Sequence, residues 1–269
     1  MRSVFQCHDG CELHYEVNDF TDPWLKAPVV VLIHGFAESQ LAWRSWIPNL
    51  SKKFKVIRLD LRGFGASTPM SESFPWSMQV VMDDLHSFIT HCTSSAVHLI
   101  GAKSGGTFAL EFASRFPNLI QTVIGVTPPV IAASGVQTWI DDLSEMGVQE
   151  WAAKTMRGRL GSCVSEQEID WWVRCVQGQT SKPSLLGYLK WIPSLDIRQS
   201  IQSILPPSLI ITTTGSGLRS VNSVKEWHAT MNNSELFVIE GDAWHAAGAY
   251  PDQCAQICLD FIEKKREKV

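Results

Sequence analysis

Short, mainly apolar runs alternate with amphipathic stretches along most of this chain. The runs are short and rich in β-branched residues, which is typical of strands buried on both faces of a parallel sheet. They predict strands at residues 29–33, 54–60, 97–100, 122–126, 208–213 and 235–240. Stretches with a helical period follow most of these runs and predict helices that begin near 39–42 and cover 76–90, 108–116, 221–231 and 252–264. This alternation predicts an α/β fold built on a doubly wound, mostly parallel sheet.

Two segments depart from this alternation. Residues 3–17 alternate apolar and polar positions on either side of an Asp-Gly turn, which predicts a β-hairpin. Residues 134–204 carry no further strand signal and predict several helices, separated by breaks at glycine and proline residues. We therefore expect a core formed by residues 1–133 and 205–269, with a helical cap formed by residues 134–204.

Composition and charge narrow the possible partners. A chain of 269 residues with 45% hydrophobic content can bury a large core, and its net charge of -4 argues against nucleic acid as a partner. The N-terminus lacks a basic region followed by an apolar run, and no apolar stretch reaches the roughly 18 residues of a membrane span. The seven cysteines are scattered and odd in number, which favours reduced thiols. We expect a cytoplasmic monomer or homodimer that acts on a small molecule without a metal or an organic cofactor and without binding a membrane.

The most informative stretch surrounds Lys103. The apolar run at 97–100 leads directly into Gly101-Ala102-Lys103-Ser104-Gly105-Gly106, and a helix follows. A nucleophile elbow needs small residues on both sides of one side chain, because its backbone is strained and its helix packs closely. Glycines two positions before and after place Lys103 at the apex, where G-x-S-x-G has serine. A one-residue shift, which would put Ser104 at the apex, stays open as the alternative.

Four motifs in order resemble the α/β-hydrolase fold with a helical cap, and the resemblance covers essentially the whole chain. They are the elbow, the loop His34-Gly35-Phe36, the D-x-R-G-x-G-x-S loop from Asp60 to Ser67, and Gly241-Asp242-Ala243-Trp244-His245 followed by Pro251. The resemblance implies an oxyanion hole from the backbone N–H groups of Phe36 and Ser104, and a catalytic histidine at His245. Within the family the chain resembles enol-lactonases and carbon–carbon bond hydrolases.

The chain departs from the family pattern at two positions. Lys103 stands where the family has its nucleophile. No carboxylate follows the runs at 208–213 or 122–126, where the family places its acid. An ordinary Ser-His-Asp triad therefore cannot be assembled from the expected positions. The sequence leaves three candidates that could hold the imidazole of His245: Thr214, Ser216 and Glu240.

A lysine at the elbow has a distinct chemistry. The helix N-terminus and burial both disfavour an ammonium and lower the pKa of Lys103, which makes the nucleophilic neutral amine accessible. Such an amine can form a Schiff base, act as a general base or, when charged, anchor a carboxylate, while His245 transfers protons. We expect hydrolysis of an ester, a lactone or an activated carbon–carbon bond, with lysine-assisted carbon–carbon cleavage as the more specific hypothesis. Two alternatives are an esterase with Ser104 as nucleophile and a catalytically silent ligand-binding protein.

The substrate-binding residues are expected near the elbow and in the cap. They are His34, Gly35, Trp139, Trp172 and Trp191. Most tryptophans of the cap should form its own core, with one or two facing the pocket. Arg157 and Arg159 could bind a substrate carboxylate, although a solvated helix face is the simpler expectation for both.

Overall fold

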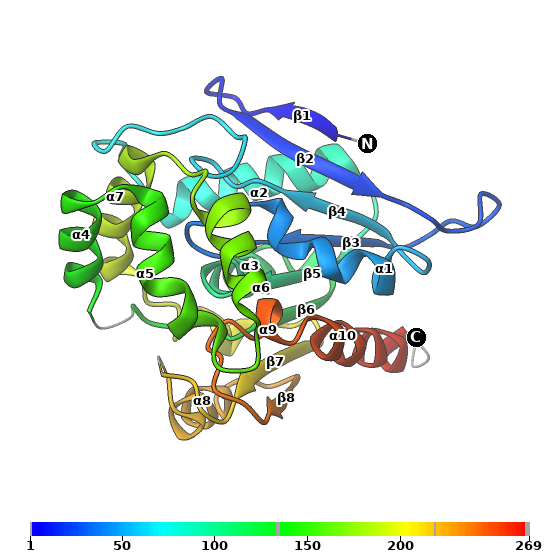
Figure 1. The fold of residues 1–269 in the computed structure, drawn as a ribbon. Helices are drawn as coiled ribbons and strands as arrows, with labels where there is room; N and C mark the ends of the chain where they lie inside the picture. Colours follow the sequence, from blue (N-terminus) through cyan, green and yellow to red (C-terminus); the bar gives the residue numbers. More distant parts are fainter. Residues whose placement is uncertain (1, 133–134, 218, 267–269) are drawn as a thin grey trace.

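One mixed sheet organises the molecule (Figure 1). The computed structural model describes residues 2–132, 135–217 and 219–266. Within these ranges eight strands pair in the order β1-β2-β4-β3-β5-β6-β7-β8. Their bounds are β1 Arg2–Gln6, β2 Glu12–Asn18, β3 Val29–Ile33, β4 Lys55–Leu59, β5 Val97–Ala102, β6 Ile120–Val126, β7 Ser208–Thr213 and β8 Ser234–Ile239. Strand β2 pairs antiparallel with β1 and β4, and all other pairs are parallel, which confirms the predicted hairpin and the mostly parallel sheet.

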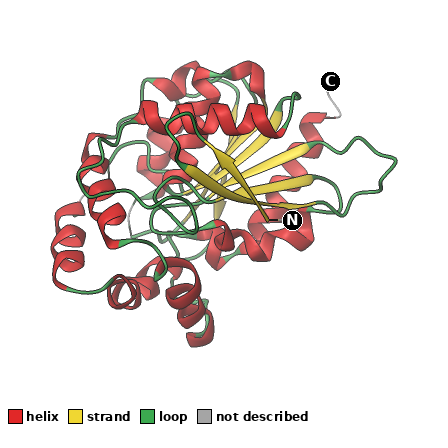
Figure 2. Cartoon of the chain, turned by 90° about the horizontal axis from the view of Figure 1, so that it is seen from above, coloured by secondary structure: helices red, strands yellow, loops and turns green. Residues whose placement is uncertain are grey.

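Helices cover both faces of the sheet (Figure 2). Those outside the segment between β6 and β7 are α1 Ile47–Leu50, α2 Met78–Cys92, α3 Ser104–Arg115, α8 Val221–His228, α9 Ala246–Ala249 and α10 Pro251–Arg266. Successive residues of a strand point to opposite faces, so a fully apolar strand serves two cores. In β3, Val31 and Ile33 join the core that contains residues of α2 and α3, while Val30 and Leu32 join the core that contains residues of α10.

The helix expected near 39–42 has a different geometry. Gln40–Trp46 forms a 3-10 helix capped by Ser39, and α1 continues it for one turn. Trp43 and Trp46 are three residues apart, which aligns them on a helix of three residues per turn. Both are buried, with ring centroids 4.9 Å apart in an edge-to-face arrangement. The spacing of the two indoles therefore matches the tighter helix.

Four α-helices occupy the segment between β6 and β7, and we call them the inserted helices. They are α4 Val136–Glu145, α5 Val148–Leu160, α6 Glu166–Trp171 and α7 Lys182–Trp191. Figure 1 shows α4, α5 and α7 at the edge of the sheet where the parallel strands end. The expected boundary between core and cap at residues 133 and 134 lies outside the described residues. Nowhere in the described ranges is a helix long and apolar enough to cross a membrane.

Candidate active site

The backbone of the elbow is strained at one residue. Lys103 links β5 to α3 with φ 52° and ψ -124°, a conformation that is costly for a residue with a Cβ atom. A Cβ at Gly101 would lie 2.1 Å from the carbonyl oxygen of Gly105, and a Cβ at Gly105 would lie 2.3 Å from that of Ile33. These contacts explain why both neighbouring positions are glycine. The backbone thus places Lys103 at the apex and Ser104 at the first position of α3.

The side chain of Lys103 is buried and folds back toward the loop after β3. Its Cε occupies the space beside Gly35, where a Cβ would lie only 2.4 Å away. Its ammonium forms an ion pair with Oε1 of Glu38, a carboxylate that has no solvent exposure. The other oxygen of Glu38, Oε2, accepts a hydrogen bond of 3.0 Å from the backbone N–H of Gly35. The loop after β3 therefore holds the carboxylate that faces the elbow.

The same carboxylate also faces the predicted catalytic histidine. Nε2 of His245 lies 2.8 Å from Oε1 of Glu38, and both side chains are buried. The backbone N–H of His245 donates to the carbonyl of Arg159, and its ring contacts Trp172 edge-on at 4.9 Å. Glu38 thus joins Lys103 and His245 into one cluster of three ionisable groups.

Burial and charge shift the pKa values of this cluster in definite directions. Burial alone would raise the pKa of Glu38, but His245 and Lys103 together hold that pKa well below its usual range. Burial lowers the pKa of His245, and Glu38 offsets this only in part. Burial lowers the pKa of Lys103 to about 8, again against the opposing effect of Glu38. Near neutral pH the cluster holds an ionised carboxylate, a neutral imidazole and an amine close to its titration point.

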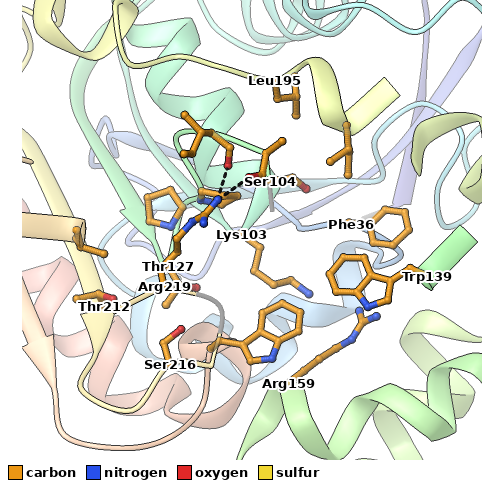
Figure 3. A pocket seen from close by; sticks show the side chains of 17 residues that line it. Phe36, Lys103, Ser104, Thr127, Trp139, Arg159, Leu195, Thr212, Ser216 and Arg219 are labelled. Carbon is orange, nitrogen blue, oxygen red and sulfur yellow. Dashed lines mark hydrogen bonds between the residues drawn. The ribbon is translucent and has the colours of Figure 1, made fainter. Parts of the chain in front are cut away.

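A small, mainly apolar pocket opens beside Lys103 (Figure 3). Its volume is about 80 Å³, which limits an occupant to a few non-hydrogen atoms. Its wall combines residues that follow the strands of the sheet with residues of the inserted helices. The lining residues are Phe36, Lys103, Ser104, Thr127, Pro128, Pro129, Ile131, Ala132, Trp139, Arg159, Ile192, Leu195, Thr212, Ser216, Arg219, Val224 and Trp244. The pocket therefore presents a few polar groups on an apolar surface, as small-molecule sites do.

The two residues expected to form the oxyanion hole, Phe36 and Ser104, both line this pocket. Ser104 begins α3, so its N–H is one of the helix-terminal donors that lack an intrahelical acceptor. The ring of Phe36 stacks on Tyr188 of α7 at 5.3 Å, which fixes its loop against the inserted helices. The loop after β3 and the first residue of α3 thus both contribute to the pocket wall.

Four of the five expected substrate-binding residues separate into three groups. Trp139 lines the pocket. Gly35 and Trp172 lie behind it, against Lys103 and His245 respectively. Trp191 packs against Tyr188 and two other aromatic rings, and it is not among the lining residues. Its position in an aromatic core makes it a packing residue of α7.

His34 also lies outside the pocket wall and connects two loops. Its Nε2 accepts a hydrogen bond of 3.0 Å from the backbone N–H of Leu61, and its Nδ1 lies 2.8 Å from the carbonyl oxygen of Gly35. The side chain is fully buried, and burial lowers its pKa, so the neutral imidazole donates from Nδ1 and accepts at Nε2. His34 therefore positions the loop that carries Phe36 and Glu38.

Sequence reasoning missed Glu38 as the partner of His245. The three candidates named from the sequence do not fill that role: Ser216 lines the pocket, Glu240 is exposed, and the Thr214 hydroxyl accepts a hydrogen bond from the N–H of Gly241. The available signal was a carboxylate two positions after His34-Gly35-Phe36, in the loop that follows a buried strand next to the elbow strand.

Arg159 is the second residue whose position the sequence did not reveal. The expectation of a solvated helix face is correct for Arg157, which pairs with Glu166 at the surface, and wrong for Arg159. Arg159 is buried and lines the pocket, because the last turn of α5 directs it toward Trp151 and Trp244. Two arginines only two positions apart in α5 thus lie on opposite sides of the helix and have opposite environments.

Comparison with known proteins agrees with this architecture. Residues 28–248 match the family model described as alpha/beta hydrolase fold. The chain belongs to this family. It is 32% identical to epoxide hydrolase 3 of Xenopus tropicalis over 38% of its own length, but the match spans only 28% of that protein. It is 22% identical to the uncharacterized hydrolase YugF of Bacillus subtilis over 95% of this chain and 96% of YugF.

Two solved structures illustrate how closely the fold is shared. An enol-lactonase from Burkholderia xenovorans superimposes with a TM-score of 0.88 at 19% identity, covering 97% of this chain and 100% of that one. An esterase from Exiguobacterium antarcticum gives a TM-score of 0.87 at 15% identity, covering 98% and 100% respectively. At such identities the likeness establishes the fold, and activity has to be argued from the site.

Proposed function

We propose that this chain is a hydrolase of small, partly apolar carbonyl compounds, namely esters, lactones or compounds with an activated carbon–carbon bond. The pocket supports this proposal because Phe36, Ser104 and the ionisable side chain of Lys103 line a mainly apolar cavity. An enol-lactonase and an esterase among its structural neighbours favour a carbonyl substrate, and an epoxide hydrolase among its relatives favours hydrolysis more generally.

The observation that carries the more specific mechanism is the amine at the elbow apex. Lys103 has a pKa of about 8, so its neutral form is populated near physiological pH, where it is an effective nucleophile toward ketones. Its lone pair forms a bond to the carbonyl carbon, the oxygen takes up a proton, and loss of water yields an iminium. The N–H groups of Phe36 and Ser104 would stabilise the negative charge that develops on oxygen.

The iminium makes a neighbouring carbon–carbon bond cleavable. In a 1,3-dicarbonyl substrate, water adds to the second carbonyl while the neutral imidazole of His245 accepts its proton. The carbon–carbon bond then breaks, its electron pair passes to the iminium to form an enamine, and a carboxylic acid leaves. Protonation of the enamine carbon and hydrolysis of the resulting iminium release the ketone and restore the amine of Lys103. The complete cycle consumes one water molecule.

Ester hydrolysis with Ser104 as the nucleophile is the second candidate. Two observations favour it. Ser104 lines the pocket directly after the apex residue, and esterases are among the structural neighbours. A direct Ser104 attack would need His245 to serve as its base. In the structure Nε2 of His245 instead faces Glu38, so this mechanism requires the imidazole to change partners.

Borohydride trapping separates these candidates. The protein is incubated with acetylacetone or with a panel of small ketones and then reduced with borohydride. The masses of the intact protein and of its peptides are measured by mass spectrometry. We expect a substrate-sized mass increase on the peptide that contains Lys103. The adduct should disappear in Lys103→Arg and persist in Lys154→Arg, which alters an exposed lysine of α5.

Two other outcomes would replace the lysine mechanism. Absence of the adduct, together with fluorophosphonate labelling that is lost in Ser104→Ala, would establish the serine esterase. Absence of adduct, labelling and ester or lactone turnover would assign the chain to the catalytically silent ligand-binding members of the fold.

A further inference from the structure

Arg159 combines complete burial with an unsatisfied guanidinium. Only 1% of the residue is exposed, and within the described ranges Nε, Nη1 and Nη2 have no hydrogen-bond partner. A buried charge without a partner is costly, because the protein replaces none of the interactions that water provided. A side chain that lowers stability in this way is expected to serve another purpose. We therefore expect the missing hydrogen-bond partner to be a ligand.

Three indole rings surround the guanidinium without using its hydrogen-bond donors. Its central carbon lies 4.5 Å from the ring centroid of Trp151, 5.5 Å from that of Trp244 and 5.7 Å from that of Trp139. Aromatic rings stabilise a guanidinium through its charge and do not accept its N–H groups in the way an oxygen does. The rings thus hold the cation in the pocket and leave its hydrogen-bonding capacity unused.

The charges on the pocket wall favour an anion. Three cations and no carboxylate occur among the described lining residues. Lys103 already pairs with Glu38, and Arg219 donates hydrogen bonds to the carbonyls of Ile131 and Ala132. Arg159 is therefore the cation of this wall whose N–H groups have no acceptor in the described structure, and Glu38 acts on it through its charge without accepting a hydrogen bond. Figure 3 shows Arg159 and Lys103 extending toward the same part of the pocket.

We propose that Arg159 binds the carboxylate of the substrate, and that the substrate is an oxo acid: a small apolar compound that carries both a carboxylate and the carbonyl that Lys103 attacks. The planar guanidinium can donate two parallel hydrogen bonds to a carboxylate, a geometry that a neutral ketone cannot match. Burial lowers the pKa of Arg159 to about 10 against the opposing effect of the Glu38 charge, so the side chain remains charged at neutral pH. This inference rests on the proposed function and names its substrate class.

Binding of a matched pair of ligands tests the proposal directly. The quenching of tryptophan fluorescence is titrated with 2-oxobutanoate and with 2-butanone, which lacks the carboxylate; both are small enough for the pocket. We expect the acid to bind about 10- to 100-fold more tightly, the range typical of charge-assisted hydrogen bonds. Arg159→Met should abolish this preference. Arg157→Met, which removes an exposed arginine from the same helix, should retain it.

Thermal unfolding without ligand distinguishes a binding role from a structural one. Because the guanidinium is unpaired, Arg159→Met is expected to melt at the same temperature as the wild type or higher. Arg159→Lys keeps the charge but loses the planar pair of donors, so we expect it to retain only part of the preference for the acid. Equal affinity of the wild type for both ligands, or an undiminished preference in Arg159→Met, would overturn the proposal.

The two proposals fail in different experiments. A Lys103 adduct without preference for the carboxylate would leave the proposed chemistry in place and remove Arg159 as the anchor. A carboxylate preference that depends on Arg159, in a protein that shows no adduct and no turnover, would remove the catalytic mechanism and retain the anion site.

Discussion

At the scale of single residues, Glu38 explains the electrostatics of the site. One of its oxygens faces both Lys103 and His245, and the other is held by the backbone of Gly35. It opposes the effect of burial on both partners, because a nearby negative charge favours their protonated forms. Without this carboxylate the pKa of Lys103 would be lower still. Glu38 is therefore a positioning residue that also sets the pH range of the site.

Replacement of Glu38 should shift the titration of Lys103 downward. An amine is reactive only when neutral, so acetylation of Lys103 by acetic anhydride should increase as the pH rises through about 8 in the wild type. Glu38→Gln removes the charge that raises this pKa, and its midpoint should move to lower pH. Peptide mass spectrometry across a pH series measures both midpoints without requiring any enzymatic activity.

Glu166→Gln provides the control for this measurement, because it removes an exposed carboxylate of α6 that pairs with Arg157. Its midpoint should equal that of the wild type. A midpoint that rises in Glu38→Gln, or that stays in place, would mean that Glu38 does not control the charge of Lys103.

At the scale of elements, backbone strain is concentrated where three adjacent strands end. The described non-glycine residues with positive φ are Ala37, Lys103 and Thr127, at 61°, 52° and 49°. They follow β3, β5 and β6, which are neighbours in the sheet. Strained residues persist only where packing enforces them, and they cluster at functional sites. The same strand ends supply Glu38, Lys103 and the part of the pocket wall that begins at Thr127.

Gly35→Ala should displace the side chain of Lys103. The added methyl group would lie 2.4 Å from Cε of Lys103 and 3.2 Å from the carbonyl oxygen of Ala102. We expect destabilisation by about 1–3 kcal/mol, as for other overpacked cores, together with a large loss of borohydride-trapped adduct at Lys103. Urea denaturation and trapping yield measure the two effects.

Gly158→Ala is the matched control, since a Cβ at this exposed position of α5 meets no atom within 4 Å. Replacing glycine in a helix should stabilise the protein by about 0.5–1 kcal/mol and leave trapping unchanged. An equal yield of trapped adduct in Gly35→Ala and in the wild type would show that adduct formation does not require the Lys103 side chain to pass over Gly35.

At the scale of the whole molecule, the site depends on how the inserted helices dock on the sheet. The hydroxyl of Ser184 in α7 accepts a hydrogen bond of 2.8 Å from the N–H of Met70 and donates one of 3.1 Å to its carbonyl. Gly187 allows close approach, because a Cβ there would lie 2.8 Å from the carbonyl oxygen of Glu72. These contacts fasten α7 to the loop between β4 and α2 and bring Tyr188 against Phe36.

Loss of the Ser184 hydroxyl should loosen this attachment. Ser184→Ala leaves the two backbone groups of Met70 without their partner, which is expected to cost about 1–3 kcal/mol of unfolding free energy. Hydrogen exchange should increase in α7 more than in β5. Ser144→Ala removes an exposed hydroxyl that bonds within its own helix, and it should change stability by less than about 0.5 kcal/mol. Equal stability of the two variants would contradict the role given to Ser184.

The sequence by itself determined the sheet, the elbow and the family. Apolar runs mark strands such as β3 and β7 at their observed bounds, because burial on both faces leaves little room for polar residues. Glycines around Lys103 mark the elbow, because its steric demands are local: they involve residues close in the chain and the neighbouring strand. Local geometry of this kind can be predicted from the order of residues alone.

Only the tertiary structure decided which ionisable groups meet. The contact of Glu38 with His245 and the burial of Arg159 among three indoles join segments that are far apart in the chain. Neither contact can be recognised from periodicity or from neighbouring residues. A charged residue occupies the same kind of position in a helical sequence whether that side of the helix faces water or a pocket. Packing of the inserted helices against the sheet selects between these environments, and that selection turns Arg159 from an expected surface residue into the unpaired cation of the site.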